Sequence, residues 1–117
     1  MVSEASELLA VADHIRPNDL EVTLKERWLR EVEGMVRSEV EGVSPHTLFA
    51  DDEWTLTVPV PYDRLYVWYL CAMIDIAQGD MALYENDLAV YNAAFHDYAK
   101  WILRNGGRSA SASSGLT

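Results

Sequence analysis

The sequence predicts an all-α protein of about four helices, with a long C-terminal helical hairpin and an extended loop or short β-arm between helices two and three. Apolar residues recur at intervals of three and four through most of the 117 residues, which is the period of one helix face. The four prolines fall between these periodic stretches, where they begin or end helices. Gly79-Asp80 is expected to divide the long C-terminal helical region into a hairpin of two helices, and one long kinked helix is the alternative.

The first helix is expected to begin at Ser3, a candidate N-cap. Glu4 and Glu7 occupy its first turn, where the helix dipole favours negative charge. Pro17 ends the helix because proline lacks a backbone donor and clashes with the preceding turn. Its apolar stripe consists of Leu8, Leu9, Val11, Ala12 and Ile15.

The second helix is expected over about residues 20–41, capped by Asn18 or Asp19. Oppositely charged residues four positions apart indicate that one of its faces lies in water. These pairs are Glu21–Lys25, Glu26–Arg30 and Glu33–Arg37. The buried face is expected to consist of Leu24, Trp28, Val32, Met35, Val36 and Val40.

Residues 42–60 form the irregular part of the chain. Residues 54–58 alternate between apolar and polar types, which predicts a short strand or extended arm. No strand partner is visible in the sequence, so one interpretation is an arm that pairs with another subunit. The other is a loop that packs Phe49 and Trp54 over the core. The candidate inter-subunit contacts are Phe49, Trp54, Leu56 and Val58.

The third helix is expected to start near Pro61, since proline suits the first helical turn. Residues 65–77 are apolar almost all round, which is typical of a helix enclosed on several sides by neighbouring helices or by other subunits. Asp75 interrupts this run and is expected to bond a tyrosine hydroxyl, an arginine or a helix end. Cys71, the single cysteine, is expected to be a small buried apolar group in a reducing compartment.

The fourth helix is expected from Met81 to about Arg104, after Gly79 in a left-handed C-terminal position and Asp80 as N-cap. Residues 1–105 are expected to form one helical domain, and residues 106–117 a disordered tail of serine, glycine and alanine. The apolar stripe of the fourth helix has a heptad-like spacing and consists of Met81, Tyr84, Leu88, Tyr91, Phe95, Tyr98 and Ile102.

The charge distribution excludes several classes of function. The net charge is −10, of which residues 1–53 contribute −8, with 13 acidic and 5 basic residues. No basic cluster is visible in the sequence, so phosphate binding is not expected.

The longest apolar run, residues 65–74, is too short to span a membrane, and the N-terminus lacks the features of a signal peptide.

The sequence gives no sign of catalytic chemistry. His14, His46 and His96 are far apart and lack the spacing of metal ligands. No glycine-rich phosphate loop or nucleophile motif is present. We therefore expect a protein that is not an enzyme, with no catalytic residues, no cofactor and no metal.

An ordered set of residues, densest between Pro61 and Arg104, forms a recognisable pattern. Its members are Arg16, Pro17, Asn18, Lys25, Trp28, Leu29, Pro61, Tyr62, Asp63, Tyr66, Tyr69, Leu70, Ile74, Asp75, Gly79, Asp80, Tyr84, Asn86, Phe95, Tyr98, Trp101 and Arg104. In this order they resemble the head–tail connector, or adaptor, proteins of tailed phages and prophages, and the resemblance covers about residues 8–104. The chain departs from the family pattern at Glu85-Asn86, where two asparagines are expected, and at Gly106-Gly107, which leads into a serine-rich tail.

The resemblance implies a structural protein of the virion neck, with residues 1–105 as a connector-like domain. Such proteins form a homo-oligomeric ring, commonly of twelve subunits, that binds the portal protein and links it to a downstream neck or tail protein. DNA passes through the ring without specific binding. The implied location is the head–tail interface of the virion, and the host cytoplasm during assembly. Phe49, Trp54, Leu56 and Val58 then become candidate contacts with a neighbouring subunit or the portal.

A second interpretation remains open. It is a small acidic helical module without catalysis, a regulatory phage or bacterial protein that binds a protein partner.

Overall fold

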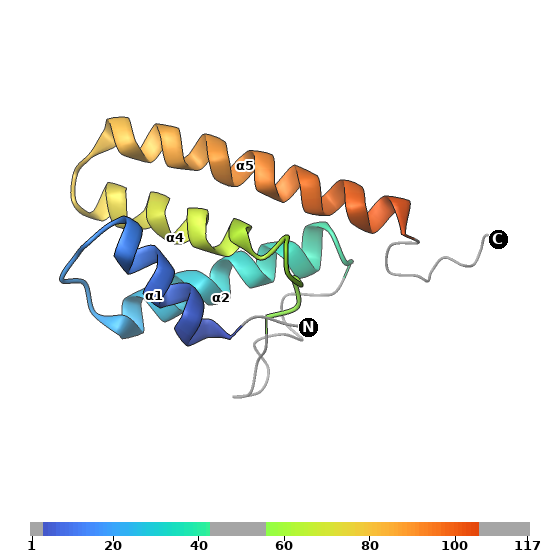
Figure 1. Ribbon diagram of the computed structural model, residues 1–117, viewed down its shortest axis with the longest axis horizontal. Helices are drawn as coiled ribbons and strands as arrows, with labels where there is room; N and C mark the ends of the chain where they lie inside the picture. Colours follow the sequence, from blue (N-terminus) through green and yellow to red (C-terminus); the bar gives the residue numbers. More distant parts are fainter. Residues whose placement is uncertain (1–3, 43–55, 106–117) are drawn as a thin grey trace.

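Four helices make up the fold in the computed structural model, which describes residues 4–42 and 56–105 (Figure 1). They are α1 (Ala5–Ile15), α2 (Val22–Glu39), α4 (Arg64–Ala77) and α5 (Met81–Arg104). No strand occurs within the two described ranges. The all-α prediction is confirmed. The expected tail, residues 106–117, lies outside the described residues.

Helix α4 lies at the centre of the molecule. It packs against α5 on one side and against α1 and α2 on the other, while α1 also contacts α2 (Figure 1). This position explains its nearly uniform apolar sequence, because a helix with neighbours on several sides has little surface left for water. The α4 side chains that are fully buried include Leu65, Tyr66, Leu70, Cys71 and Ile74.

The hairpin between α4 and α5 forms where the sequence predicts it. Gly79 has a φ of 79°, in the left-handed region that favours glycine. The Asp80 side chain accepts a hydrogen bond from the Leu83 amide at 3.1 Å, which makes it the N-cap of α5. The two helices therefore run antiparallel along most of their length.

The other helix starts differ from the predictions. Glu4 is the N-cap of α1, without a side-chain hydrogen bond, and Ser3 lies outside the described residues. Glu21 is the N-cap of α2. Asn18 instead accepts a hydrogen bond from the Leu20 amide at 2.9 Å, so it stabilises the turn before the helix.

The third predicted helix begins later than expected. The Val60–Pro61 peptide bond is cis, and the Tyr62 amide donates to the Pro59 carbonyl at 2.8 Å, which closes a turn. The helix therefore begins at Arg64 rather than near Pro61.

The buried face of α2 is rotated relative to the prediction. Leu24 was expected in the core but is 38% exposed, whereas Lys25 is 5% exposed and Leu29 is fully buried. Glu33 was expected on a water-facing side and is also fully buried. The prediction was wrong for Leu24 and Glu33, because the periodicity of apolar residues does not show that Lys25 and Glu33 have polar partners in the interior. The predicted core residues that are buried are Trp28, Val32, Val36 and Val40.

Candidate functional site

One cluster of charged side chains joins α1 to the α4–α5 hairpin. The Arg16 guanidinium donates from Nε to Asp75 Oδ1 at 3.0 Å, and from Nη2 to Asp87 Oδ1 at 3.0 Å. Asp75 is 1% exposed and Asp87 is fully buried. Of the three partners that the sequence left open for Asp75, the structure shows the arginine. Two buried carboxylates therefore share one guanidinium.

Because the two carboxylates share one guanidinium, Asp75 accepts fewer hydrogen bonds than Asp87. The Oδ2 atom of Asp75 is buried and has no hydrogen-bond partner among the described residues. Burial, followed by the hydrogen bond and the charge of Asp87, raises the pKa of Asp75 to about 7, and Arg16 opposes this shift only in part. Near neutral pH, a proton on Asp75 removes the repulsion between the two carboxylates.

Replacing Asp75 with asparagine is expected to change how stability depends on pH. The Asp75 carboxyl contributes stability that is present below its ordinary pKa of 3.8 and is lost as pH rises through about 7, because the folded chain holds a proton that the unfolded chain releases. As the pH rises from about 4 to about 7, Asp75→Asn should gain stability relative to the unaltered protein by up to about 4 kcal/mol, at about 1.4 kcal/mol for each pKa unit.

Urea unfolding at several pH values measures this gain. Asp19→Asn, at an exposed acid, is the matched control, and its stability relative to the unaltered protein should stay nearly constant. An equal effect of Asp75→Asn at acidic and alkaline pH would contradict the proposed protonation.

A second cluster fixes the turn between α1 and α2. The Lys25 amine lies 2.9 Å from Asp13 Oδ1 and 3.2 Å from Asn18 Oδ1. Burial disfavours ionisation of Asp13, but the hydrogen bonds from Lys25 and Asn18 outweigh it and lower the pKa of this carboxyl. Lys25 is thus a buried cation with its own anion, which explains why a lysine occupies a core position on α2.

A third cluster surrounds the buried carboxylate of Glu33 on α2. Arg37 Nε donates to Glu33 Oε2 at 2.6 Å, as the four-residue spacing predicted. Thr57 donates from its amide at 3.2 Å and from Oγ1 at 2.8 Å, and the Tyr66 hydroxyl on α4 donates to Oε1. Burial, followed by the charge of Glu33, raises the pKa of Tyr66, so the hydroxyl keeps its proton and remains a donor.

Thr57 connects this cluster to α5. Its Oγ1 atom also lies 2.9 Å from Glu41 Oε2, and the Tyr98 hydroxyl donates to the same oxygen at 2.8 Å. Because Thr57 has one hydroxyl hydrogen, it donates to Glu33 or to Glu41 at any moment. The Tyr66 hydroxyl on α4 also accepts a hydrogen bond from the Val58 amide at 3.0 Å. These contacts hold the segment before α4 against α2 and α5.

These clusters are structural in character. Burial, followed by the charge of Asp87, raises the pKa of the Cys71 thiol to about 12, so it is a poor nucleophile. His14 and His96 are exposed, and His46 lies outside the described residues. In the described ranges, no group of three or more His, Cys, Asp or Glu side chains is placed to hold a metal ion.

The candidate contact residues fall into two groups. Phe49 and Trp54 lie outside the described residues. Leu56 is 3% exposed and Val58 is fully buried, and both belong to the chain's own hydrophobic core. The side chains of Leu56 and Val58 therefore leave almost no surface for a partner in this structure.

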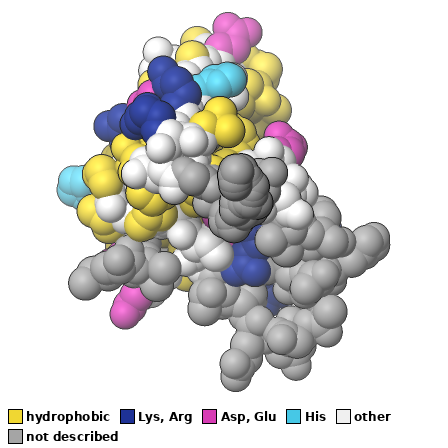
Figure 2. Space-filling model, turned by 90° about the vertical axis from the view of Figure 1, so that its right-hand side faces the viewer, with side chains coloured by type: hydrophobic (Ala, Val, Ile, Leu, Met, Phe, Trp, Pro, Cys, Tyr) yellow, Lys and Arg dark blue, Asp and Glu magenta, His cyan; other side chains and the backbone are white. Residues whose placement is uncertain are grey.

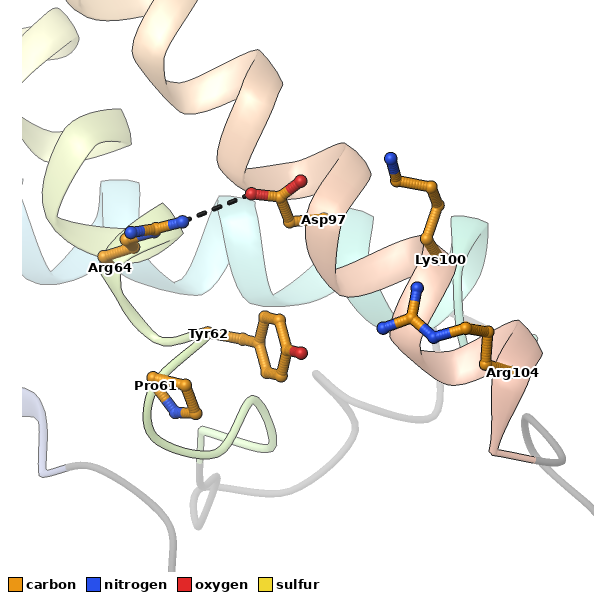
Figure 3. Close-up of a pocket in the computed structure, with 6 residues that line it drawn as sticks. All are labelled: Pro61, Tyr62, Arg64, Asp97, Lys100 and Arg104. Atoms are coloured by element: carbon orange, nitrogen blue, oxygen red, sulfur yellow. Dashed lines mark hydrogen bonds and ion pairs between the residues drawn. The ribbon is translucent and has the colours of Figure 1, made fainter.

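A basic pocket lies at the end of the hairpin where α4 begins and α5 ends (Figure 3). It has a volume of about 390 Å³ and is lined by Pro61, Tyr62, Arg64, Asp97, Lys100 and Arg104. Arg64 Nη2 lies 3.2 Å from Asp97 Oδ2. Figure 2 shows dark-blue side chains gathered at this end of the molecule, beside hydrophobic ones. This basic cluster was not predicted from the sequence, because Arg64 is far along the chain from Lys100 and Arg104.

The register of the hairpin holds the signal that could have revealed the pocket. Arg64 and Asp97 lie at similar distances along the chain from the Gly79-Asp80 turn, so antiparallel pairing places them side by side. Tyr69 and Tyr91 follow the same rule, with ring centroids 5.3 Å apart. Applying this register to the basic residues brings positions 100 and 104 to the same end as position 64.

In the described part of the chain, no helix combines the length and apolar character needed to cross a bilayer. Comparisons with protein-family models, with curated proteins and with solved structures found no match to this chain.

Proposed function

We propose that this chain is a structural assembly protein of the head–tail connector type, which binds the portal as a ring of copies and links it to the next neck or tail protein. The observation that carries the proposal is the ordered residue set that resembles this family over about residues 8–104. The all-α fold with a long C-terminal hairpin is compatible with it.

Contacts within that residue set support the proposal. Arg16 and Asp75 belong to the set, lie 59 positions apart and bond each other. Tyr62 packs against Tyr98 and Trp101 of the set, with ring centroids 5.9 and 5.5 Å apart. Members from distant parts of the chain are therefore partners in one fold, as expected if the resemblance reflects a shared arrangement of helices.

The charge distribution is also compatible with a ring around DNA. Residues 1–53 carry most of the net charge of −10. If the acidic first half faces a channel, it repels DNA phosphates and lets the duplex pass without binding.

Mixing the purified chain with the candidate portal protein of the same genome tests the proposal. We expect co-sedimentation with portal rings on a gradient and an added ring of density by electron microscopy. Portal alone and an unrelated protein ring of similar size serve as controls. If the chain stays at the top of the gradient at every concentration and salt level, the connector proposal is overturned.

The second candidate function is a small acidic module that binds a protein partner without being part of a virion. The basic pocket favours it, because an exposed charged cavity suits partner recognition. Gene order separates the two candidates: a connector gene is expected close after the portal and major capsid genes.

A further inference from the structure

We propose that the basic pocket between α4 and α5 binds an acidic segment of a protein partner, with its carboxylates on Arg64, Lys100 and Arg104. The pocket is formed by the turn before α4 and the last turns of α5 (Figure 3). The proposal is independent of the connector function, because it follows from the charge, exposure and shape of this site alone.

The pocket holds cations that have no strong ion pair among the described residues. Most described cations outside it are already paired with acids of the same chain: Arg16, Lys25, Arg27 and Arg37. Inside the pocket, Lys100 and Arg104 make no ion pair within the described residues. Two cations with no acidic partner in those ranges are unusual on a protein with a net charge of −10.

The third cation is held weakly. Arg64 pairs with Asp97 at 3.2 Å, but their side chains are 61% and 45% exposed. An exposed pair of this kind contributes little, so the guanidinium can exchange Asp97 for an incoming carboxylate. With Asp97 as its one acid, the pocket retains a local charge of about +2.

The shape of the pocket suits carboxylate side chains. Arg104 extends from α5 towards the Tyr62 ring, whereas Lys100 lies along the outer rim (Figure 3). A guanidinium presents parallel N–H groups that match the two oxygens of a carboxylate. Tyr62 is itself held between α5 rings, at 5.5 Å from Trp101, so one wall of the pocket is fixed before any partner arrives.

Apolar side chains beside the pocket indicate a protein segment rather than a small anion. Leu103 is 77% exposed and Val60 is 61% exposed, the two highest values among the large apolar side chains of the described residues. Each is the chain neighbour of a pocket residue, Arg104 and Pro61 respectively. Exposed apolar groups next to cations fit a partner that alternates acidic and apolar residues.

Nucleic acid is the less suitable occupant. A protein that binds DNA strongly neutralises many phosphates, and three clustered cations reach only a few. The chain as a whole has a net charge of −10, which disfavours the approach of a long polyanion. A short acidic segment contacts the pocket without crossing that surface.

Fluorescence anisotropy with a short labelled peptide of alternating glutamate and leucine tests the site. The full chain is expected to bind this peptide, and to bind a glutamine–leucine peptide and single-stranded oligothymidylate less tightly. Raising the salt from about 50 mM to about 300 mM should weaken binding, because the exposed charges are then screened.

The variant Lys100→Gln/Arg104→Gln should weaken binding of the glutamate peptide by about tenfold or more, since it removes two charge-assisted contacts. Both side chains are exposed, so circular dichroism and the unfolding midpoint should be unchanged. Arg27→Gln, at a cation 76% exposed on α2, is the matched control and should bind as the unaltered protein does.

Three results would overturn the proposal. One is the absence of saturable binding of the glutamate peptide at low salt. Another is equal binding by the double variant, which would place the peptide elsewhere. The third is tighter binding of oligothymidylate than of the peptide, which would assign the pocket to nucleic acid. None of these results bears on portal binding, so failure here is distinct from failure of the connector proposal.

Discussion

Replacing Arg16 with methionine is expected to lower the free energy of unfolding by about 4 kcal/mol. The guanidinium is bonded to two carboxylates at once, Asp75 and Asp87, which are 1% and 0% exposed. Methionine leaves both in the interior without their cation. The loss should shrink as the pH is lowered, because a protonated Asp75 no longer repels its neighbour.

Urea unfolding followed by circular dichroism and tryptophan fluorescence measures this loss. Arg27→Met is the matched control: this side chain is 76% exposed, with one ion pair of 3.5 Å to Glu31. We expect it to change stability by less than about 0.5 kcal/mol. A loss below about 1 kcal/mol for Arg16→Met would show that the buried carboxylates do not depend on the guanidinium.

A second substitution keeps the test informative if the methionine variant does not fold. Arg16→Lys retains the charge but not the forked geometry, so it can approach one carboxylate well and the other poorly. We expect a smaller loss, of about 2 kcal/mol. Equal losses for lysine and methionine would mean that geometry rather than charge sets the stability of the cluster.

The hairpin was predictable because its determinants are local. Gly79 supplies the left-handed residue, Asp80 supplies the cap, and the predicted bounds of the last helix, Met81–Arg104, match the structure. A turn of this kind needs only neighbouring residues to specify it. The continuously apolar third helix was also correctly interpreted as enclosed, because α4 has α1, α2 and α5 around it.

The buried charges were harder to predict because their partners are distant in sequence. Glu33 is bonded to Thr57, 24 positions away, and to Tyr66, 33 positions away. From the sequence, its pairing with Arg37 looked like a solvent-exposed helix pair. Burial of that pair depends on a loop packing over α2, which residue periodicity along one helix does not report.

Part of the candidate surface was predictable in principle. Antiparallel pairing about a known turn places the start of α4 beside the end of α5, and so places Arg64 near Asp97. No two cations adjoin each other along the sequence, so no basic cluster was predicted. In a helical hairpin, residues separated by more than 30 positions line the same pocket.

The second large effect is expected at Glu33. Glu33→Gln should lower the free energy of unfolding by about 3 kcal/mol, although glutamine has nearly the same shape. Every contact of the carboxylate is with a donor: the Arg37 guanidinium, the Thr57 amide and hydroxyl, and the Tyr66 hydroxyl. One oxygen of the carboxylate is replaced by the NH₂ of the amide, which places a donor against donors in a fully buried site.

Glu26→Gln, at an exposed position of the same helix, is the control and should change stability by less than about 0.5 kcal/mol. A double-mutant cycle with Tyr66→Phe then isolates the contact between α2 and α4. The phenylalanine removes one donor to Glu33 and leaves the Val58 amide without its acceptor. We expect the two substitutions to be non-additive by about 1 kcal/mol or more. Strict additivity would mean that the carboxylate and the tyrosine stabilise the fold separately, and that the segment before α4 is held by its apolar side chains alone.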